Sequence, residues 1–114
     1  MFSEKHFLII GAHPDDADMM FGGCAVQSVR KGHKIKFVST TNGNAGHFSE
    51  TKKNLAERRL NEAQQIVKIS GIEEYEILNN LDGELTASIE NRKQIITLIR
   101  EFKPDVVISH RIYD

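Results

Sequence analysis

The chain has 114 residues and a formal net charge of −1, so it is long enough for one domain with a buried core. Its Lys and Arg residues are spread along the sequence, which argues against a nucleic-acid partner. A single cysteine, Cys24, excludes an internal disulfide framework and favours a reducing compartment. No apolar run approaches the roughly 20 residues of a membrane span. We therefore expect a cytoplasmic protein without a membrane span.

Strand-like and helix-like segments alternate along the chain. Short runs rich in apolar and β-branched residues predict strands over residues 7–10, 35–39, 75–78 and 106–109. Apolar residues at helical spacing predict helices over residues 17–31, 52–70 and 89–102. Gly32 and Gly71 stand where the first two helices end, and Ser88 is a candidate N-cap of the third. The alternation predicts an α/β fold, a Rossmann-like three-layer domain whose parallel sheet stops after about the fourth strand.

All strands of a parallel sheet end at the same edge, so the loops that follow them converge. The loops here are residues 13–16, 41–46, 79–84 and 110–114. Each is rich in polar residues or glycine. Open α/β sheets bind their ligands at this edge, and we therefore look for functional residues in these loops.

The first of these loops carries a histidine and two carboxylates directly after a buried strand. His13 and Asp16 offer an imidazole nitrogen and a carboxylate oxygen to a zinc ion, which leaves Asp15 to take a proton from water. Pro14 stiffens the turn. In the structural alternative, Asp15 or Asp16 caps the following helix and His13 is an ordinary strand-end residue. The spacing alone does not separate these two interpretations.

Four further polar residues are candidates for substrate binding. They are Asn44 in the second loop, Arg59 in the second helix, Asp82 in the third loop and His110 after the fourth strand. Structural alternatives exist, because Asn42-Gly43 is a turn signal and Arg59 can pair with a glutamate on a solvated helix face. A lone histidine such as His110 more often supports a site than binds a metal. The role of His47 stays open.

Five motifs together resemble the LmbE-like, or PIG-L, family of zinc-dependent N-deacetylases. They are Ala12-His13-Pro14-Asp15-Asp16, Thr41-Asn42-Gly43-Asn44-Ala45-Gly46, Arg59-Leu60-Asn61-Glu62-Ala63, Asp82-Gly83-Glu84-Leu85 and Pro104-Asp105-Val106-Val107-Ile108-Ser109-His110-Arg111. The motifs cover the whole chain, and the ordered set is far more specific than any one of them. The resemblance implies a Rossmann-like fold and zinc-dependent hydrolysis of the N-acetyl group of an amino sugar or glycoconjugate.

The resemblance also implies roles for individual residues. His13 and Asp16 are expected to bind zinc, and Asp15 is expected to activate water as the base. Arg59 and Asp82 fall where the family contacts its substrate. In the first loop, His13 and Asp16 would thus bind the metal ion, and Asp15 would accept the proton.

The family takes its third zinc ligand from a His-Pro-Asp-His segment. In this sequence that segment would follow directly after Asp114, so we expect the third ligand beyond Asp114. We therefore expect the chain to be the amino-terminal part of one deacetylase domain, inactive on its own. Because a shortened sheet exposes apolar surface, association into a homo-oligomer is a further expectation.

Two other functions would use the same edge of the sheet. One is a non-catalytic Rossmann-like module that binds a sugar or a nucleotide, although no Gly-x-Gly-x-x-Gly follows the first strand. The other is a metal-dependent hydrolase of a phosphoester, against which the lack of a basic cluster in the loops counts. We favour the deacetylase and keep the binding module as the alternative.

Overall fold

The computed structural model describes residues 3–45 and 51–112. Its strands are β1 (His6–Gly11), β2 (Lys34–Ser39), β3 (Glu74–Ile77) and β4 (Val106–Ile108). Its helices are α1 (Asp16–Arg30), α2 (Lys52–Ser70) and α3 (Ile89–Phe102). All the predicted strands and helices are present, and each boundary lies within one residue of its prediction.

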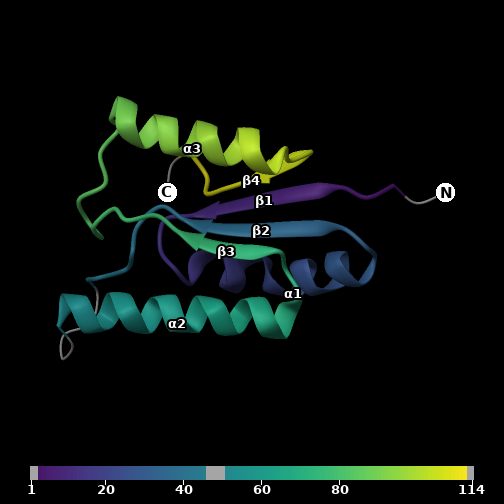
Figure 1. The fold of residues 1–114 in the computed structure, drawn as a ribbon, viewed down its shortest axis with the longest axis horizontal. Helices are drawn as coiled ribbons and strands as arrows, with labels where there is room; N and C mark the ends of the chain where they lie inside the picture. Colours follow the sequence, from purple (N-terminus) through teal and green to yellow (C-terminus); the bar gives the residue numbers. More distant parts are fainter. Residues whose placement is uncertain (1–2, 46–50, 113–114) are drawn as a thin grey trace.

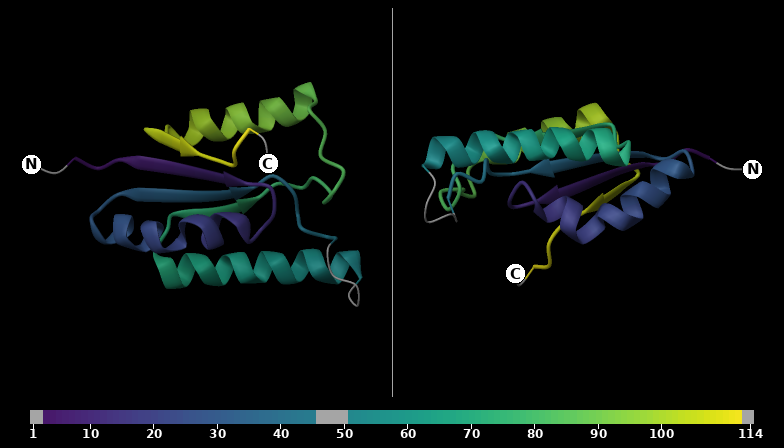
Figure 2. Two further views of the ribbon diagram at one scale, coloured as in Figure 1. Left: turned by 180° about the vertical axis from the view of Figure 1, so that it is seen from behind. Right: turned by 90° about the horizontal axis from the view of Figure 1, so that it is seen from below.

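The strands form one parallel sheet in the order β3-β2-β1-β4. Figure 1 shows α1 and α2 on one face of this sheet and α3 on the other, and the two views of Figure 2 show the same layers from behind and from below. The prediction of an α/β three-layer domain with a parallel sheet is therefore confirmed.

The side chains of β1 point alternately into two cores, one on each face of the sheet. Ile9 packs with Phe37 in the core that α1 and α2 cover. Leu8 and Ile10 pack in a second core together with Leu98 of α3. Because β1 is buried on both faces, the loop at its carboxyl end starts from a fixed position.

Side chains and one glycine set the ends of α2 and α3. Thr51 Oγ1 accepts a hydrogen bond from Asn54 N at 3.2 Å at the start of α2, and Ser88 Oγ accepts one from Asn91 N at 3.1 Å at the start of α3. The predicted N-cap of α3 is thus confirmed. Gly71 ends α2 with φ of 79°, the left-handed conformation that glycine adopts without strain. Among the residues described, no helix is long and apolar enough to cross a membrane.

The path of the chain changes direction beside β1. From β1 it moves outward through β2 and β3, with α1 and α2 on one face (Figure 2). Helix α3 then crosses the opposite face and brings the chain back to β4, on the other side of β1. A topological switch point therefore lies between β1 and β4, which is where open α/β sheets form a ligand-binding crevice.

Candidate metal-binding and catalytic site

An open crevice of about 440 Å³ lies at the switch point. It is lined by Ala12, His13, Asp16, His110 and Arg111. Three of these residues come from the loop after β1 and the start of α1, and the other two follow β4. Segments about 98 residues apart meet here because β1 pairs with β4.

The Asp16 carboxylate organises the turn that follows β1. Its Oδ2 atom accepts hydrogen bonds from Ala12 N at 3.0 Å and from His13 N at 2.9 Å. Asp16 N in turn donates to His13 O at 3.1 Å. Gly11 makes this possible, since a Cβ atom there would stand 2.6 Å from Asp16 Cβ. The hydrogen bonds of the Asp16 carboxylate therefore fix the backbone of this turn.

Asp15 occupies the N-cap position of α1, but its side chain makes no capping hydrogen bond. Asp16 is the first helical residue, and its carboxylate binds the loop N–H groups of the preceding turn. Asp15 thus stands at the N-cap, as the structural alternative predicted, but it makes no capping hydrogen bond through its side chain. Within residues 3–45 and 51–112, the half-buried Asp15 carboxylate has no hydrogen-bond or ion-pair partner, which leaves it available as a base.

His13 lies between two carboxylates. Its Nε2 atom is 2.8 Å from Asp82 Oδ1, and its Nδ1 atom is 3.5 Å from Asp16 Oδ2. A neutral imidazole that donates Nε2–H to Asp82 directs the Nδ1 lone pair toward Asp16. A proton or a metal cation between two such acceptors removes their repulsion, and a tetrahedral zinc ion holds its ligands roughly 3.3–3.6 Å apart. The pair therefore fits a metal ion, with Asp82 as the carboxylate that orients the histidine.

His110 reaches the same carboxylate from the loop after β4. Its Nε2 atom lies 3.2 Å from Asp16 Oδ2 and 3.2 Å from Ala12 N. This contact joins the two sides of the crevice. In the part of the chain that the structure describes, no three His, Cys, Asp or Glu side chains are arranged to hold one metal ion. His13 and Asp16 thus remain a candidate pair of ligands and not a complete set.

The third ligand was expected beyond Asp114, and Asp114 itself lies outside the described residues. Within residues 3–45 and 51–112, no side chain takes the place of that ligand, since no group of three metal-binding side chains is found there. The position of the third ligand therefore stays a prediction.

The loops after β2 and β3 are joined by a hydrogen bond beside the turn. Asn44 is buried, and its Oδ1 atom accepts a hydrogen bond from Asp82 N at 2.9 Å, which fixes the residue that binds His13. Arg59 pairs with Glu62 at 2.9 Å, as its structural alternative predicted. The structure therefore brings Asn44 and Asp82 to the turn. The stem of Arg59 lies beside it as well, since a Cβ atom on Gly43 would stand 3.2 Å from Arg59 Cγ and 2.8 Å from Pro14 Cδ. His47, whose role the sequence leaves open, lies outside the described residues.

Tyr75 is a residue of this region that the sequence analysis missed. Its side chain is buried in β3, and its hydroxyl donates to Pro14 O and lies 2.9 Å from Asp18 Oδ1. Burial raises the pKa of Tyr75, and the charge of Asp18 acts in the same direction, so the hydroxyl keeps its proton. Burial also raises the pKa of Asp18. Nothing in the spacing of the sequence links a strand tyrosine to a proline 61 residues earlier.

A family model described as PIG-L, GlcNAc-PI de-N-acetylase, matches residues 8–114. The chain belongs to the PIG-L family. It is similar to the diacetylchitobiose deacetylase of Thermococcus kodakarensis, with 32% identity over 106 residues that cover 91% of this chain and 40% of that protein. It is also similar to a probable N-acetyl-alpha-D-glucosaminyl L-malate deacetylase 2 of Bacillus anthracis, with 27% identity over 116 residues, 96% of this chain and 51% of that protein.

The same family is found among solved structures. The N,N'-diacetylchitobiose deacetylase of Pyrococcus horikoshii, complexed with its inhibitor, superposes with a TM-score of 0.83 and 31% sequence identity. The match covers 90% of this chain and 39% of that chain. The resemblance to the PIG-L family is therefore confirmed, and the chain spans about half, or less, of the length of these relatives.

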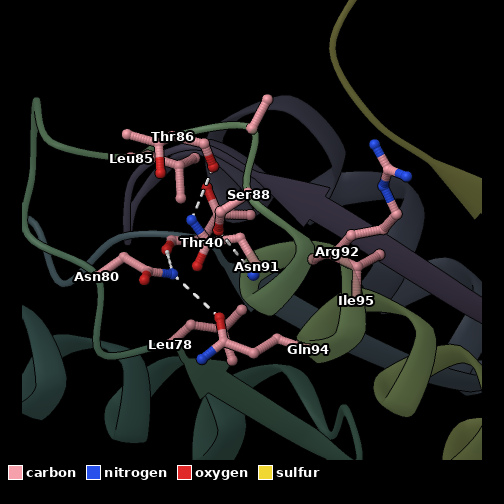
Figure 3. A pocket seen from close by; sticks show the side chains of 11 residues that line it. Thr40, Leu78, Asn80, Leu85, Thr86, Ser88, Asn91, Arg92, Gln94 and Ile95 are labelled. Carbon is pink, nitrogen blue, oxygen red and sulfur yellow. Dashed lines mark hydrogen bonds between the residues drawn. The ribbon is translucent and has the colours of Figure 1, made fainter.

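A second cavity, of about 190 Å³, lies at the amino-terminal end of α3 (Figure 3). Asn80 Nδ2 stands at its wall, where it donates to Thr40 O at 2.9 Å and to Gln94 Oε1 at 3.2 Å. None of the candidate metal, catalytic or substrate-binding residues that the structure describes lines this cavity. In the described part of the chain, the crevice lined by His13 and Asp16 and the cavity beside α3 share no lining residue.

Proposed function

We propose that this chain carries the amino-terminal part of a zinc-dependent N-deacetylase, which removes the acetyl group from an amino sugar or a glycoconjugate. Membership of the PIG-L family and the deacetylase names of its relatives support this proposal. The observation that carries it is the arrangement at the switch point. His13 Nδ1 and Asp16 Oδ2 lie 3.5 Å apart, and Asp15 lies in the same turn without a partner among the described residues.

In this proposal, His13 and Asp16 hold the zinc ion and Asp82 keeps the imidazole in the orientation that binds it. When bound, zinc supplies a Lewis acid for the amide carbonyl and lowers the pKa of water. Arg59, Asp82, Asn44 and His110 stay our candidates for contacts with the sugar. Their hydrogen-bonding groups would orient the N-acetyl group toward the turn.

Asp15 moves the proton. It accepts a proton from the attacking water while the water oxygen bonds to the acetyl carbon. The C–N bond then breaks, and Asp15 returns the proton to the leaving amine. The second proton of the water passes from the new carboxyl group to the amine, so the products are acetate and the protonated amino sugar, and atoms and charge balance without any further reactant. A carboxylate tied up in a cap or an ion pair would be a poorer base, and the open position of Asp15 supports this role.

The test uses the complete natural polypeptide that carries residues 1–114, with N,N'-diacetylchitobiose as substrate and acetate release as the measurement. Asp15→Asn should keep its zinc, measured by elemental analysis, and lower kcat by about 10²- to 10⁴-fold. Asp105→Asn, a matched change at the other end of the sheet, should keep both zinc and turnover. Full activity of the Asp15 variant would remove Asp15 as the base. Turnover that persists after complete metal removal would exclude zinc, and sugar binding without acetate release would favour a binding module.

A further inference from the structure

The hydroxyl of Tyr75 crosses from β3 to the turn after β1. The side chain is only 3% exposed, and its ring packs edge-on against Phe37 of β2, with ring centroids 5.3 Å apart and planes at 87°. From this fixed position the hydroxyl donates to Pro14 O. A tyrosine held by its ring in the core has little freedom to move its oxygen, so the hydroxyl is a fixed donor for the turn.

The carbonyl groups of the turn each have a partner. Ala12 O accepts from Thr41 Oγ1 at 2.7 Å, and His13 O accepts from Asp16 N at 3.1 Å. Pro14 O is the next in the series, and its partner is the Tyr75 hydroxyl. Because Pro14 is buried, loss of that hydroxyl would leave a carbonyl without a hydrogen bond in a place that water reaches poorly.

The Pro14 carbonyl belongs to the peptide group that joins Pro14 to Asp15. On the other side, Asp15 O accepts a hydrogen bond from Met19 N at 3.0 Å. The ring of Pro14 is also confined, since a Cβ atom on Gly43 would stand 2.8 Å from Pro14 Cδ. The two peptide groups that flank the Asp15 Cα atom are therefore both held, one by α1 and one by Tyr75.

We propose that Tyr75 is a positioning residue for Asp15, whose hydroxyl fixes the Pro14–Asp15 peptide group and thereby the direction of the Asp15 carboxylate. The link to catalysis rests on the proposed function, in which Asp15 is the base. The hydrogen bond by which Tyr75 holds the turn does not depend on that function. Asp18 Oδ1, at 2.9 Å, is a second acceptor for the same hydroxyl proton and competes with Pro14 O for it.

Amide hydrogen exchange, followed by NMR on the complete natural polypeptide that carries residues 1–114, tests whether Tyr75 holds the turn. Tyr75→Phe removes one oxygen and should speed exchange at His13 N and Asp16 N about tenfold, the effect of one lost buried hydrogen bond. Exchange at the amides of β1 and β2 should not change. Asp18→Ala should leave the turn amides as protected as in the wild type, because Pro14 O then has no competitor for the proton.

A matched control removes a side-chain hydroxyl that donates a hydrogen bond to a backbone carbonyl far from the turn. Ser70 Oγ donates to Ile66 O at 2.5 Å near the end of α2, and Ser70→Ala should leave the turn amides unchanged. Unchanged turn amides in Tyr75→Phe would overturn the proposal. Equal acceleration across turn and sheet would also overturn it, because that pattern reports a general loss of stability.

The wild-type chain provides a measurement that does not depend on a variant folding. The Tyr75 hydroxyl proton should be visible as a slowly exchanging resonance with nuclear Overhauser effects to protons of Pro14 and Asp15. A hydroxyl proton that exchanges at the rate of free tyrosine, or that shows contacts to Asp18 alone, would overturn the assignment of Pro14 O as its acceptor.

Kinetics on the complete natural polypeptide test the link to Asp15. Tyr75→Phe should lower kcat about tenfold and leave KM and zinc content unchanged, since Asp15 acts on water and not on the sugar. A loosened turn with an unchanged kcat would overturn the positioning role. If the wild type releases no acetate, the proposed function fails, and the exchange experiment still decides whether Tyr75 holds the turn.

Discussion

Each end of β1 carries a histidine, and the two ends are built differently. At the amino end, His6 Nδ1 lies 3.2 Å from Phe102 O, and the two rings pack with centroids 5.3 Å apart. His6 N also donates to Asp105 Oδ2 at 2.8 Å. At the carboxyl end, both ring nitrogens of His13 face carboxylate oxygens, and 49% of the side chain is exposed.

The difference separates a structural histidine from a candidate ligand. His6 bonds to a backbone carbonyl and packs against an aromatic ring, so it joins the end of α3 to the sheet. His13 makes neither kind of contact with its ring, which lies between the carboxylates of Asp16 and Asp82 at an open crevice. The same substitution at the two ends should therefore affect different properties, stability at the amino end and metal binding at the carboxyl end.

The largest effect is expected for His13→Ala. Removal of one of two candidate ligands should weaken zinc binding by about 100-fold or more, because the loss of a supporting group alone costs 10- to 100-fold. The free energy of unfolding in the absence of metal should change little. Isothermal titration with zinc and denaturant unfolding measure the two quantities. An unchanged zinc affinity would show that His13 is not a ligand. The two histidines at the ends of β1 would then not differ in metal binding.

Asp82→Ala should have the next largest effect. Without the carboxylate 2.8 Å from Nε2, the ring of His13 loses the partner that orients it, and zinc affinity should fall about 10- to 100-fold. Asp82→Asn keeps an oxygen that accepts the hydrogen bond and should lose less. Zinc titration of the three proteins gives the order. Equal affinities in all three would show that Asp82 does not orient the imidazole.

His6→Ala tests the amino end. It removes the contact with Phe102 O and the ring packing, and should lower the free energy of unfolding by about 1–2 kcal/mol. Zinc affinity should stay at the wild-type value. Urea unfolding and zinc titration check the two expectations. A variant with full stability and weakened metal binding would reverse the roles assigned to the two histidines.

Asp18→Asn should have the smallest effect of these variants. Unlike His6→Ala, it should raise the free energy of unfolding. Burial holds the pKa of Asp18 above its ordinary value in the folded chain. A carboxyl group with a raised folded pKa contributes stability below its unfolded pKa, and this contribution is lost as the pH rises through the folded pKa. The variant should therefore match the wild type in acid and become the more stable protein toward neutral pH, as measured by urea unfolding across this range. A variant less stable at neutral pH would contradict this.

Much of the fold could be predicted because its signals are local. Apolar runs and helical spacing placed every element within one residue, and Ser88 and Gly71 marked helix ends by their own chemistry. The carboxyl edge of the sheet followed from strand direction alone. The convergence of Asn44 and Asp82 on the turn beside His13 is a consequence of that geometry.

The details of the site depend on contacts between distant parts of the chain. The pairing of His13 with Asp82 spans 69 residues, and that of Tyr75 with Pro14 spans 61. No spacing rule encodes either, because each arises from the order of strands and the depth of the core. The role of Asp16 is local but was open from sequence, since a carboxylate after a proline turn can bond forward into a helix or backward to the strand end.

The pairing of β1 with β4 has a consequence for how the molecule folds. Ala12 and His110 are 98 residues apart, so the crevice forms only when the segment after β1 and the segment after β4 come together. Such non-local contacts carry a high loop-closure cost and tend to form late. An ion bound between the loops would bind the folded chain and not the unfolded one, and would add its binding free energy to stability by mass action. Occupancy of the crevice should thus govern how long β4 remains paired with β1.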